Sequence, residues 1–228
     1  METNKTTKTQ VYNLIILDKS GSMDSIRTAA IDGYNETLGS IRAAQLKHID
    51  TQRHFISLAV FCGCGVDMVY NCVPIADADK LTHKMYEPCC MTPLYDAIGT
   101  GVKHIMKKIA NKENVAVLVT IITDGQENAS QEWNGKAIKK LIEERKEDGW
   151  MFSYIGADHD VESVASSISI TNTVTWTKTV EGTEEVFCCE NQARTRFFNK
   201  VASCMTDGSK SMKNHLKNFS SEYYKEDL

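Results

Sequence analysis

The chain has 228 residues, of which 42% are hydrophobic and 25% are charged, and its net charge is −4 with a pI near 5.9. These values are typical of a globular protein with one large α/β domain or two small ones. The acidic balance argues against a nucleic-acid binder, which usually presents a basic face and a high pI. With only three prolines, the sequence leaves little room for a disordered linker.

Apolar patterns along the chain predict strands that alternate with helices. In chain order we expect a strand at 11–17, a helix at 26–46, a hairpin of strands at 54–61 and 66–73, a helix at 94–109, a strand at 114–122, a helix at 133–147, a strand at 150–157, a helix at 161–168, a strand at 171–176 and a helix at 183–204. This order predicts an α/β fold, namely a doubly wound, Rossmann-like three-layer α/β/α sandwich. Its sheet is expected to be mostly parallel, with one antiparallel edge strand from the hairpin.

The ends of the chain are more polar than its middle. We therefore divide it into a polar N-terminal extension (1–10), one domain (11–205) and a polar C-terminal tail (206–228). The N-terminus has no apolar stretch like that of a secretory signal, and the longest apolar run, at 115–122, is too short to span a bilayer. We expect a cytoplasmic protein that does not bind membranes.

Three segments with oxygen-bearing side chains are expected at one edge of the sheet, two of them after predicted strands and one before a predicted helix. Parallel α/β sheets bind ligands beyond the carboxyl ends of their strands, which is where these segments fall. Ser20, Ser22 and Thr92 offer neutral hydroxyl oxygens, whereas Asp18 and Asp124 can either ligate a cation or accept hydrogen bonds from its bound waters. A hard cation such as Mg²⁺ takes such oxygen ligands and keeps several waters.

Each of these segments also suits a simpler structural role. Ser22 or Asp24 can cap the helix that follows, and Thr92 can cap the helix that begins after Pro93. The TDG sequence at 123–125 is by itself a turn signal. We expect capping in addition to metal binding, because the three segments occur together at the correct ends of the predicted strands.

The same three segments carry a family resemblance. DKSGS at 18–22, MTPLYDAIG at 91–99 and ITDGQEN at 122–128 resemble the von Willebrand factor A-type domain, whose metal-ion-dependent adhesion site has the pattern D-x-S-x-S, then a Thr, then T/S-D-G. The likeness extends over roughly residues 11–200 and is strongest to the stand-alone intracellular bacterial and phage type. One departure is the sequence CCM at 89–91, where small residues often precede the Thr.

The resemblance implies a divalent-cation site made by Asp18, Ser20, Ser22, Thr92 and Asp124. Mg²⁺ is the expected ion, with Mn²⁺ and Ca²⁺ as alternatives. The residue types favour a binding role as well, because an ion held mainly by hydroxyls and water keeps enough positive charge to accept a carboxylate from another molecule. We expect a protein partner that presents Asp or Glu.

The eight cysteines do not form a recognisable zinc pattern, since their spacings are C-x-C and two C-C pairs. We expect reduced and mostly buried thiols. A thiol site is conceivable if Cys62 and Cys64, at the hairpin turn, approach Cys89 and Cys90. We disfavour it, because adjacent cysteines do not easily ligate one ion.

Two alternative functions remain open from the sequence. The first is a metal-dependent hydrolase-like enzyme, for which His159 or Glu127 is the best candidate base, and the second is a structural subunit with a vestigial metal site. Asp158, His159 and Asp160 are interpreted as a helix-capping loop, and Glu127 and Asn128 as rim residues. Since no phosphate-binding glycine motif is present, nucleotide binding is not expected.

Overall fold

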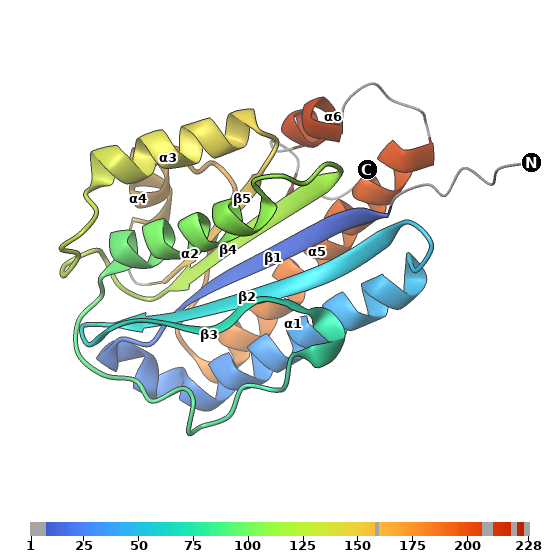
Figure 1. The fold of residues 1–228 in the computed structure, drawn as a ribbon. Helices are drawn as coiled ribbons and strands as arrows, with labels where there is room; N and C mark the ends of the chain where they lie inside the picture. The colour runs from blue at the N-terminus through green and yellow to red at the C-terminus, as the bar shows by residue number, and fades with distance from the viewer. Residues whose placement is uncertain (1–7, 158–159, 207–211, 220–222, 226–228) are drawn as a thin grey trace, which may run out of the picture.

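A six-stranded sheet forms the middle layer of the computed structural model, which describes residues 8–157, 160–206, 212–219 and 223–225. The strands are β1 (Thr9–Asp18), β2 (Gln52–Cys62), β3 (Gly65–Pro74), β4 (Val115–Thr123), β5 (Met151–Gly156) and β6 (Thr173–Thr175). Their spatial order is β3-β2-β1-β4-β5-β6, and only the β2–β3 pair is antiparallel (Figure 1). The predicted fold class and the antiparallel edge strand are confirmed.

Helices cover both faces of this sheet. The helices are α1 (Arg27–Lys47), α2 (Leu94–Ile109), α3 (Gly135–Glu147), α4 (Val161–Ser167), α5 (Val180–Thr206) and α6 (Met212–Phe219), with short 3-10 turns η1 (Gly21–Ile26) and η2 (Ile75–Asp77). Helices α1 and α5 lie on one side of the sheet, and α2 and α3 lie on the other (Figure 1). Apolar residues of α1, α5 and α6 belong to one core, and those of α2, α3 and α4 belong to the other. The central strands are therefore buried on both faces.

Strand β1 shows why the sheet separates two cores. Successive side chains of a strand point to opposite faces, so its alternate apolar residues pack in different layers. Val11, Ile15 and Leu17 belong to the core with α1 and α5, whereas Tyr12, Leu14 and Ile16 belong to the core with α2 and α3. Such burial contributes about 25 cal/mol per Å² of apolar area removed from water.

The segment predicted as a polar tail differs from that expectation in its described residues. It contains α6, and Leu216 and Tyr223 are 2% and 0% exposed in the core beside α5. The lysines of this segment make its average composition polar, but its apolar residues share one helix face and pack inward. None of the helices among the described residues is both long and apolar enough to cross a bilayer.

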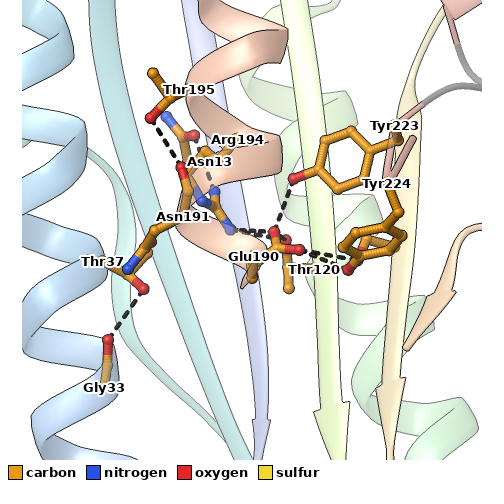
Figure 2. Close-up of polar contacts among 11 residues, drawn as sticks. Asn13, Gly33, Thr37, Thr120, Glu190, Asn191, Arg194, Thr195, Tyr223 and Tyr224 are labelled. Carbon is orange, nitrogen blue, oxygen red and sulfur yellow. Dashed lines mark hydrogen bonds and ion pairs between the residues drawn. The ribbon is translucent and has the colours of Figure 1, made fainter. Parts of the chain in front are cut away.

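A buried polar cluster links α5 to the sheet and to the C-terminal segment (Figure 2). The Glu190 carboxylate pairs with the Arg194 guanidinium at 2.8 Å, and both side chains are almost fully buried. The same carboxylate accepts hydrogen bonds from the hydroxyls of Thr120, Tyr223 and Tyr224 at 2.8, 2.8 and 2.6 Å. Paired in this way, the two buried charges avoid most of the cost of an isolated ion.

Candidate metal centre

The three predicted rim segments meet at the carboxyl edge of the sheet. Strand β1 ends at Asp18, and β4 ends at Thr123, immediately before Asp124. The two strands are parallel neighbours, with Leu17 opposite Ile122, so their carboxyl ends lie side by side (Figure 1). A hydrogen bond of 2.5 Å from the Thr123 hydroxyl to Asp18 Oδ2 joins them directly.

The hydroxyls of the first segment lie against the carboxylate of the third. Ser20 Oγ is 3.2 Å from Ser22 Oγ, and the Ser22 hydroxyl donates to Asp124 Oδ1 at 2.7 Å. Neighbouring oxygens around an octahedral Mg²⁺ are separated by about 2.9 Å, given Mg–O distances of about 2.05 Å. The two separations, which are those of hydrogen bonds, lie on either side of that value, so neighbouring oxygens in this row are close enough to share one small cation.

Asp18 is completely buried below this row of oxygens. Its Oδ1 accepts a hydrogen bond from the Ser20 backbone N–H at 2.6 Å, which fixes the turn that carries the two serines. Burial raises the pKa of Asp18 to about 6, although the hydrogen bonds from Thr123 and Ser20 oppose the shift. A negative charge is therefore costly at this position unless a cation lies nearby.

Thr92 is positioned by its backbone. The Thr92 N–H donates to Asn128 Oδ1 at 2.8 Å, and the Asn128 N–H donates to the Thr92 carbonyl at 3.2 Å. Thr92 Oγ1 also lies only 3.0 Å from where a Cβ on Gly125 would be, so a larger residue at 125 would collide with the hydroxyl. Asn128 is therefore a rim residue, and it holds the loop that carries Thr92 against the segment at 123–125.

The expected helix caps are absent from these residues. Neither η1 nor α1 has a side-chain cap, since the Ser22 hydroxyl donates to Asp124 instead. Helix α2 likewise has no cap from Thr92, and the Tyr95 N–H donates to Glu127 Oε2 at 2.8 Å. The capping prediction for Ser22, Asp24 and Thr92 is therefore wrong. Glu127, which is distant in sequence, supplies the acceptor at the start of α2, and the Ser22 hydroxyl is used at the rim.

Lys178 is a rim residue that the sequence interpretation missed. It follows β6, and its ammonium group lies 3.0 Å from Asp124 Oδ2, with 22% of its side chain exposed against 0% for Asp124. A lysine shortly after the last strand of a parallel sheet is a usable signal for the rim, but the distance to Asp124 depends on the path of the loop. In this structure a side-chain cation already neutralises one carboxylate of the site.

The donor set fits a hard divalent cation. Hydroxyl and carboxylate oxygens are its preferred ligands, and the ammonium on Asp124 shows that the site accepts a positive charge. Asp18, Ser20, Thr92 and Asp124 are at most 6% exposed, whereas Ser22 is exposed. The five residues named by the resemblance are therefore close to one edge, with an opening to solvent at Ser22.

The candidate residues of the GADHD sequence are only partly described. Asp158 and His159 lie outside the described residues. Asp160 caps α4 by accepting a hydrogen bond from the Ser163 N–H at 3.1 Å, which confirms the capping interpretation for that residue.

Comparison with known proteins supports this description of the fold. No family model matches the sequence, and no curated protein matches it either. Among solved structures, the chain is similar to a von Willebrand factor type A protein from Catenulispora acidiphila, with TM-score 0.51 and 13% identity over 86% of this chain and 43% of that one. The fold is that of a von Willebrand factor type A domain.

Two further solved structures are also similar to this chain. One is proximal thread matrix protein 1 from the mussel byssus with a zinc-occupied MIDAS motif, with TM-score 0.51 and 12% identity over 82% of this chain and 46% of that one. The other is the pilus adhesin SpaC from Lactobacillus rhamnosus GG, with TM-score 0.55 and 15% identity over 84% of this chain and 31% of that one. The chain thus spans less than half the length of these proteins, and the likeness concerns the fold.

Proposed function

We propose that the chain is a divalent-metal-dependent protein-binding module. Asp18, Ser20, Ser22, Thr92 and Asp124 would hold Mg²⁺ at the carboxyl edge of the sheet, with Mn²⁺ and Ca²⁺ as alternative ions. A bound cation would supply a positive charge and one ligand position for an Asp or Glu of a partner protein. The observation that carries this proposal is the row of oxygens from Ser20 to Asp124, spaced at 3.2 and 2.7 Å.

The protein residues divide this task between them. The serine hydroxyls contribute oxygen atoms without negative charge, so they leave the charge of a cation largely uncompensated. Asp18 holds the Ser20 backbone N–H and the Thr123 hydroxyl, which orients the serine turn relative to β4. The three neutral hydroxyls, in place of further carboxylates, therefore favour an acidic partner over a neutral one.

Lys178 gives the rim a second positive group. When a dication takes over the charge of Asp124, the ammonium no longer has to neutralise that carboxylate. It is partly exposed, so it can then attract an acidic surface toward the opening at Ser22. The salt dependence of association is expected to include this contribution.

The hydrogen bonds of Glu127 favour a binding role over hydrolysis. Its Oε2 accepts from the Tyr95 N–H and the Ser130 hydroxyl, and its Oε1 accepts from the N–H groups of Ala129 and Ser130. A carboxylate with both oxygens used in this way stabilises a loop and the start of α2. It is poorly placed to remove a proton from a substrate. The cytoplasmic location expected from the sequence stays part of this proposal.

The proposal is tested in two steps. Calorimetry with Mg²⁺ and Mn²⁺ should detect one site in the wild type and none in Asp18→Asn, whereas Asp32→Asn, an exposed aspartate on α1, should behave as the wild type. Affinity capture from cells should then retain a partner in Mg²⁺ and release it in chelator. Equal capture by Asp18→Asn in excess chelator would exclude the metal-bridged mechanism.

A further inference from the structure

Four thiols from two separate segments meet beside the rim. Cys62 ends β2 and Cys64 lies in the turn to β3, while Cys89 and Cys90 lie shortly before Thr92. The expectation that the cysteines are mostly buried is wrong, since only Cys62, Cys72 and Cys204 are buried. The remaining thiols include three that reach the surface at this cluster, where solvent and ions have access.

Three of the four sulfur atoms form one close group, and the fourth, Cys90 Sγ, lies beside Cys64 Sγ. Cys62 Sγ is 3.0 Å from Cys89 Sγ, and Cys64 Sγ is 3.7 Å from the sulfurs of both Cys89 and Cys90. Ligand atoms of Cys62, Cys64 and Cys89 all lie within 4.8 Å of one another. Four sulfurs bound to one zinc ion at about 2.3 Å are about 3.8 Å apart, which matches the two longer distances.

The backbone brings the two segments together and overcomes the objection to adjacent cysteines. Cys90 has a φ of 57°, a left-handed conformation that is strained for a residue with a side chain. In this conformation Cys89 and Cys90 both approach the same Cys64 sulfur. Gly63 permits the contact, because a Cβ at that position would lie 3.0 Å from Cys90 Cβ and 3.0 Å from the Met91 nitrogen.

Hydrogen bonds attach this thiol loop to the first rim segment. The Cys89 N–H donates to the Lys19 carbonyl at 2.9 Å, and the Gly21 N–H donates to the Cys90 carbonyl at 3.2 Å. The positions of the Cys89 and Cys90 sulfurs are therefore set by the backbone that also carries the rim serines. A strained conformation held by two such bonds is expected where it serves a function.

The four cysteines of this cluster are free thiols, which makes them available as metal ligands. A bound dication displaces the thiol protons and removes the repulsion between the resulting thiolates.

We propose that Cys62, Cys64 and Cys89 bind a structural Zn²⁺ ion, with Cys90 as the fourth ligand. Thiolates select thiophilic d¹⁰ ions, whereas the oxygens of the rim select hard cations, so the two sites take different metals from the same solution. The zinc ion joins the end of β2, the β2–β3 turn and the loop before Thr92. It thereby fixes one side of the rim independently of what the rim binds.

Cobalt substitution tests the site through a signal that the rim cannot give. Reduced, metal-free protein titrated with Co²⁺ should bind it with a thiolate-to-cobalt charge-transfer band and the strong visible bands of a tetrahedral ion, and Zn²⁺ should abolish both. Cys64→Ser and Cys89→Ser should each weaken binding by at least about tenfold. These thiols are exposed or half-buried, so the variants are expected to fold, as the far-ultraviolet circular dichroism will show.

Matched variants separate this site from other thiols and from the rim. Cys188→Ser, which changes an exposed cysteine on α5, and Ser22→Ala, which removes a rim hydroxyl, should both keep the cobalt bands at wild-type affinity. No charge-transfer band in reduced wild-type protein, or an undiminished band in folded Cys64→Ser and Cys89→Ser, would overturn the proposal. Neither result would bear on Mg²⁺ binding at the rim, which calorimetry measures separately.

Discussion

Two parts of the protein bury carboxylates, and they satisfy them differently. In the interior, Glu190 is neutralised by a guanidinium and surrounded by hydroxyls from the sheet and from the C-terminal tyrosines (Figure 2). At the rim, Asp18 has no cationic partner among the described contacts, and Asp124 has only the partly exposed Lys178. The interior cluster is closed by the protein itself, whereas the rim remains open on one side.

This difference distinguishes the Glu190 carboxylate, which stabilises the fold, from the Asp18 carboxylate, which we expect to take part in ligand binding. Glu190 is held by partners that cannot leave without exposing buried polar atoms. Asp18 instead has its pKa raised by burial, which means that its charge opposes folding in the absence of a cation. A carboxylate kept at such a cost is expected to serve ligand binding.

The largest effect is expected where the closed cluster is broken. Glu190→Ala leaves the fully buried Arg194 without its counter-ion, and it leaves the Tyr223 hydroxyl without its acceptor. The free energy of unfolding should fall by about 3–5 kcal/mol, measured by urea denaturation.

The control for this loss is an exposed ion pair. Lys140 and Glu144 face each other at 4.0 Å on α3 with exposed side chains, so Glu144→Ala should cost less than about 1 kcal/mol. A loss of similar size in both variants would show that the interior cluster does not have the special role assigned to it.

The corresponding change at the rim should behave in the opposite way. Asp18→Asn removes a costly charge, so in chelator the variant should unfold at the same temperature as the wild type or a higher one. Saturating Mg²⁺, at about 100 times its Kd, should stabilise the wild type by about 2.7 kcal/mol and leave the variant unchanged. Thermal unfolding with and without Mg²⁺ measures both. A variant that is destabilised in chelator would mean that Asp18 supports the fold as Glu190 does.

The pH dependence sharpens the same comparison. The raised pKa means that folded protein holds the Asp18 proton more tightly than the unfolded chain between about pH 4 and 6, so metal-free stability due to Asp18 falls as pH rises through this window. Burial lowers the pKa of His54 to about 3, which gives the opposite slope. The quantity to follow is therefore the difference in the free energy of unfolding between the wild type and Asp18→Asn, in which the contribution of His54 cancels.

Between pH 4 and 6.5, the free energy of unfolding of Asp18→Asn should rise relative to that of the wild type by on the order of 2 kcal/mol. Above about pH 6.5 the difference should stay constant. Chemical denaturation at several pH values in chelator gives the measurement. Parallel curves for the two proteins would show that Asp18 titrates normally in the fold.

A smaller effect is expected from the serine hydroxyl at the opening. Ser22→Ala removes one oxygen that lies 2.7 Å from Asp124 and is exposed, so the fold should lose less than about 0.5 kcal/mol. Mg²⁺ affinity should nevertheless fall by about tenfold or more. Calorimetry detects the change, and Ser166→Ala, at an exposed position of α4, is the matched control. Unchanged affinity in Ser22→Ala would remove Ser22 from the ligand set.

The smallest effect concerns Lys178. Its ammonium must give up Asp124 when a dication binds, so Lys178→Met should raise Mg²⁺ affinity by up to about fivefold, the equivalent of about 1 kcal/mol for such a pair. The same calorimetric titration tests it. Lower affinity in the variant would show that the lysine helps to hold the site together.

The sequence was sufficient for features that depend on strand ends. Asp18 and Asp124 follow apolar strands, and the carboxyl ends of parallel strands share an edge, so their approach follows from the predicted fold. The positions of Lys178 and of the four clustered thiols depend on loop conformations that no periodicity fixes, including the left-handed Cys90. The cap of α2 could not be predicted either, because its acceptor, Glu127, lies in a loop that is distant in sequence.

Diffraction at the manganese absorption edge from crystals soaked in Mn²⁺ tests the central claim most directly. The claim predicts an anomalous peak bounded by the oxygens of Ser20, Ser22, Thr92 and the Asp124 side of the rim, with at least one ligand position facing solvent. Well-ordered rim residues without a peak, or an ion enclosed on all sides by protein atoms, would contradict it.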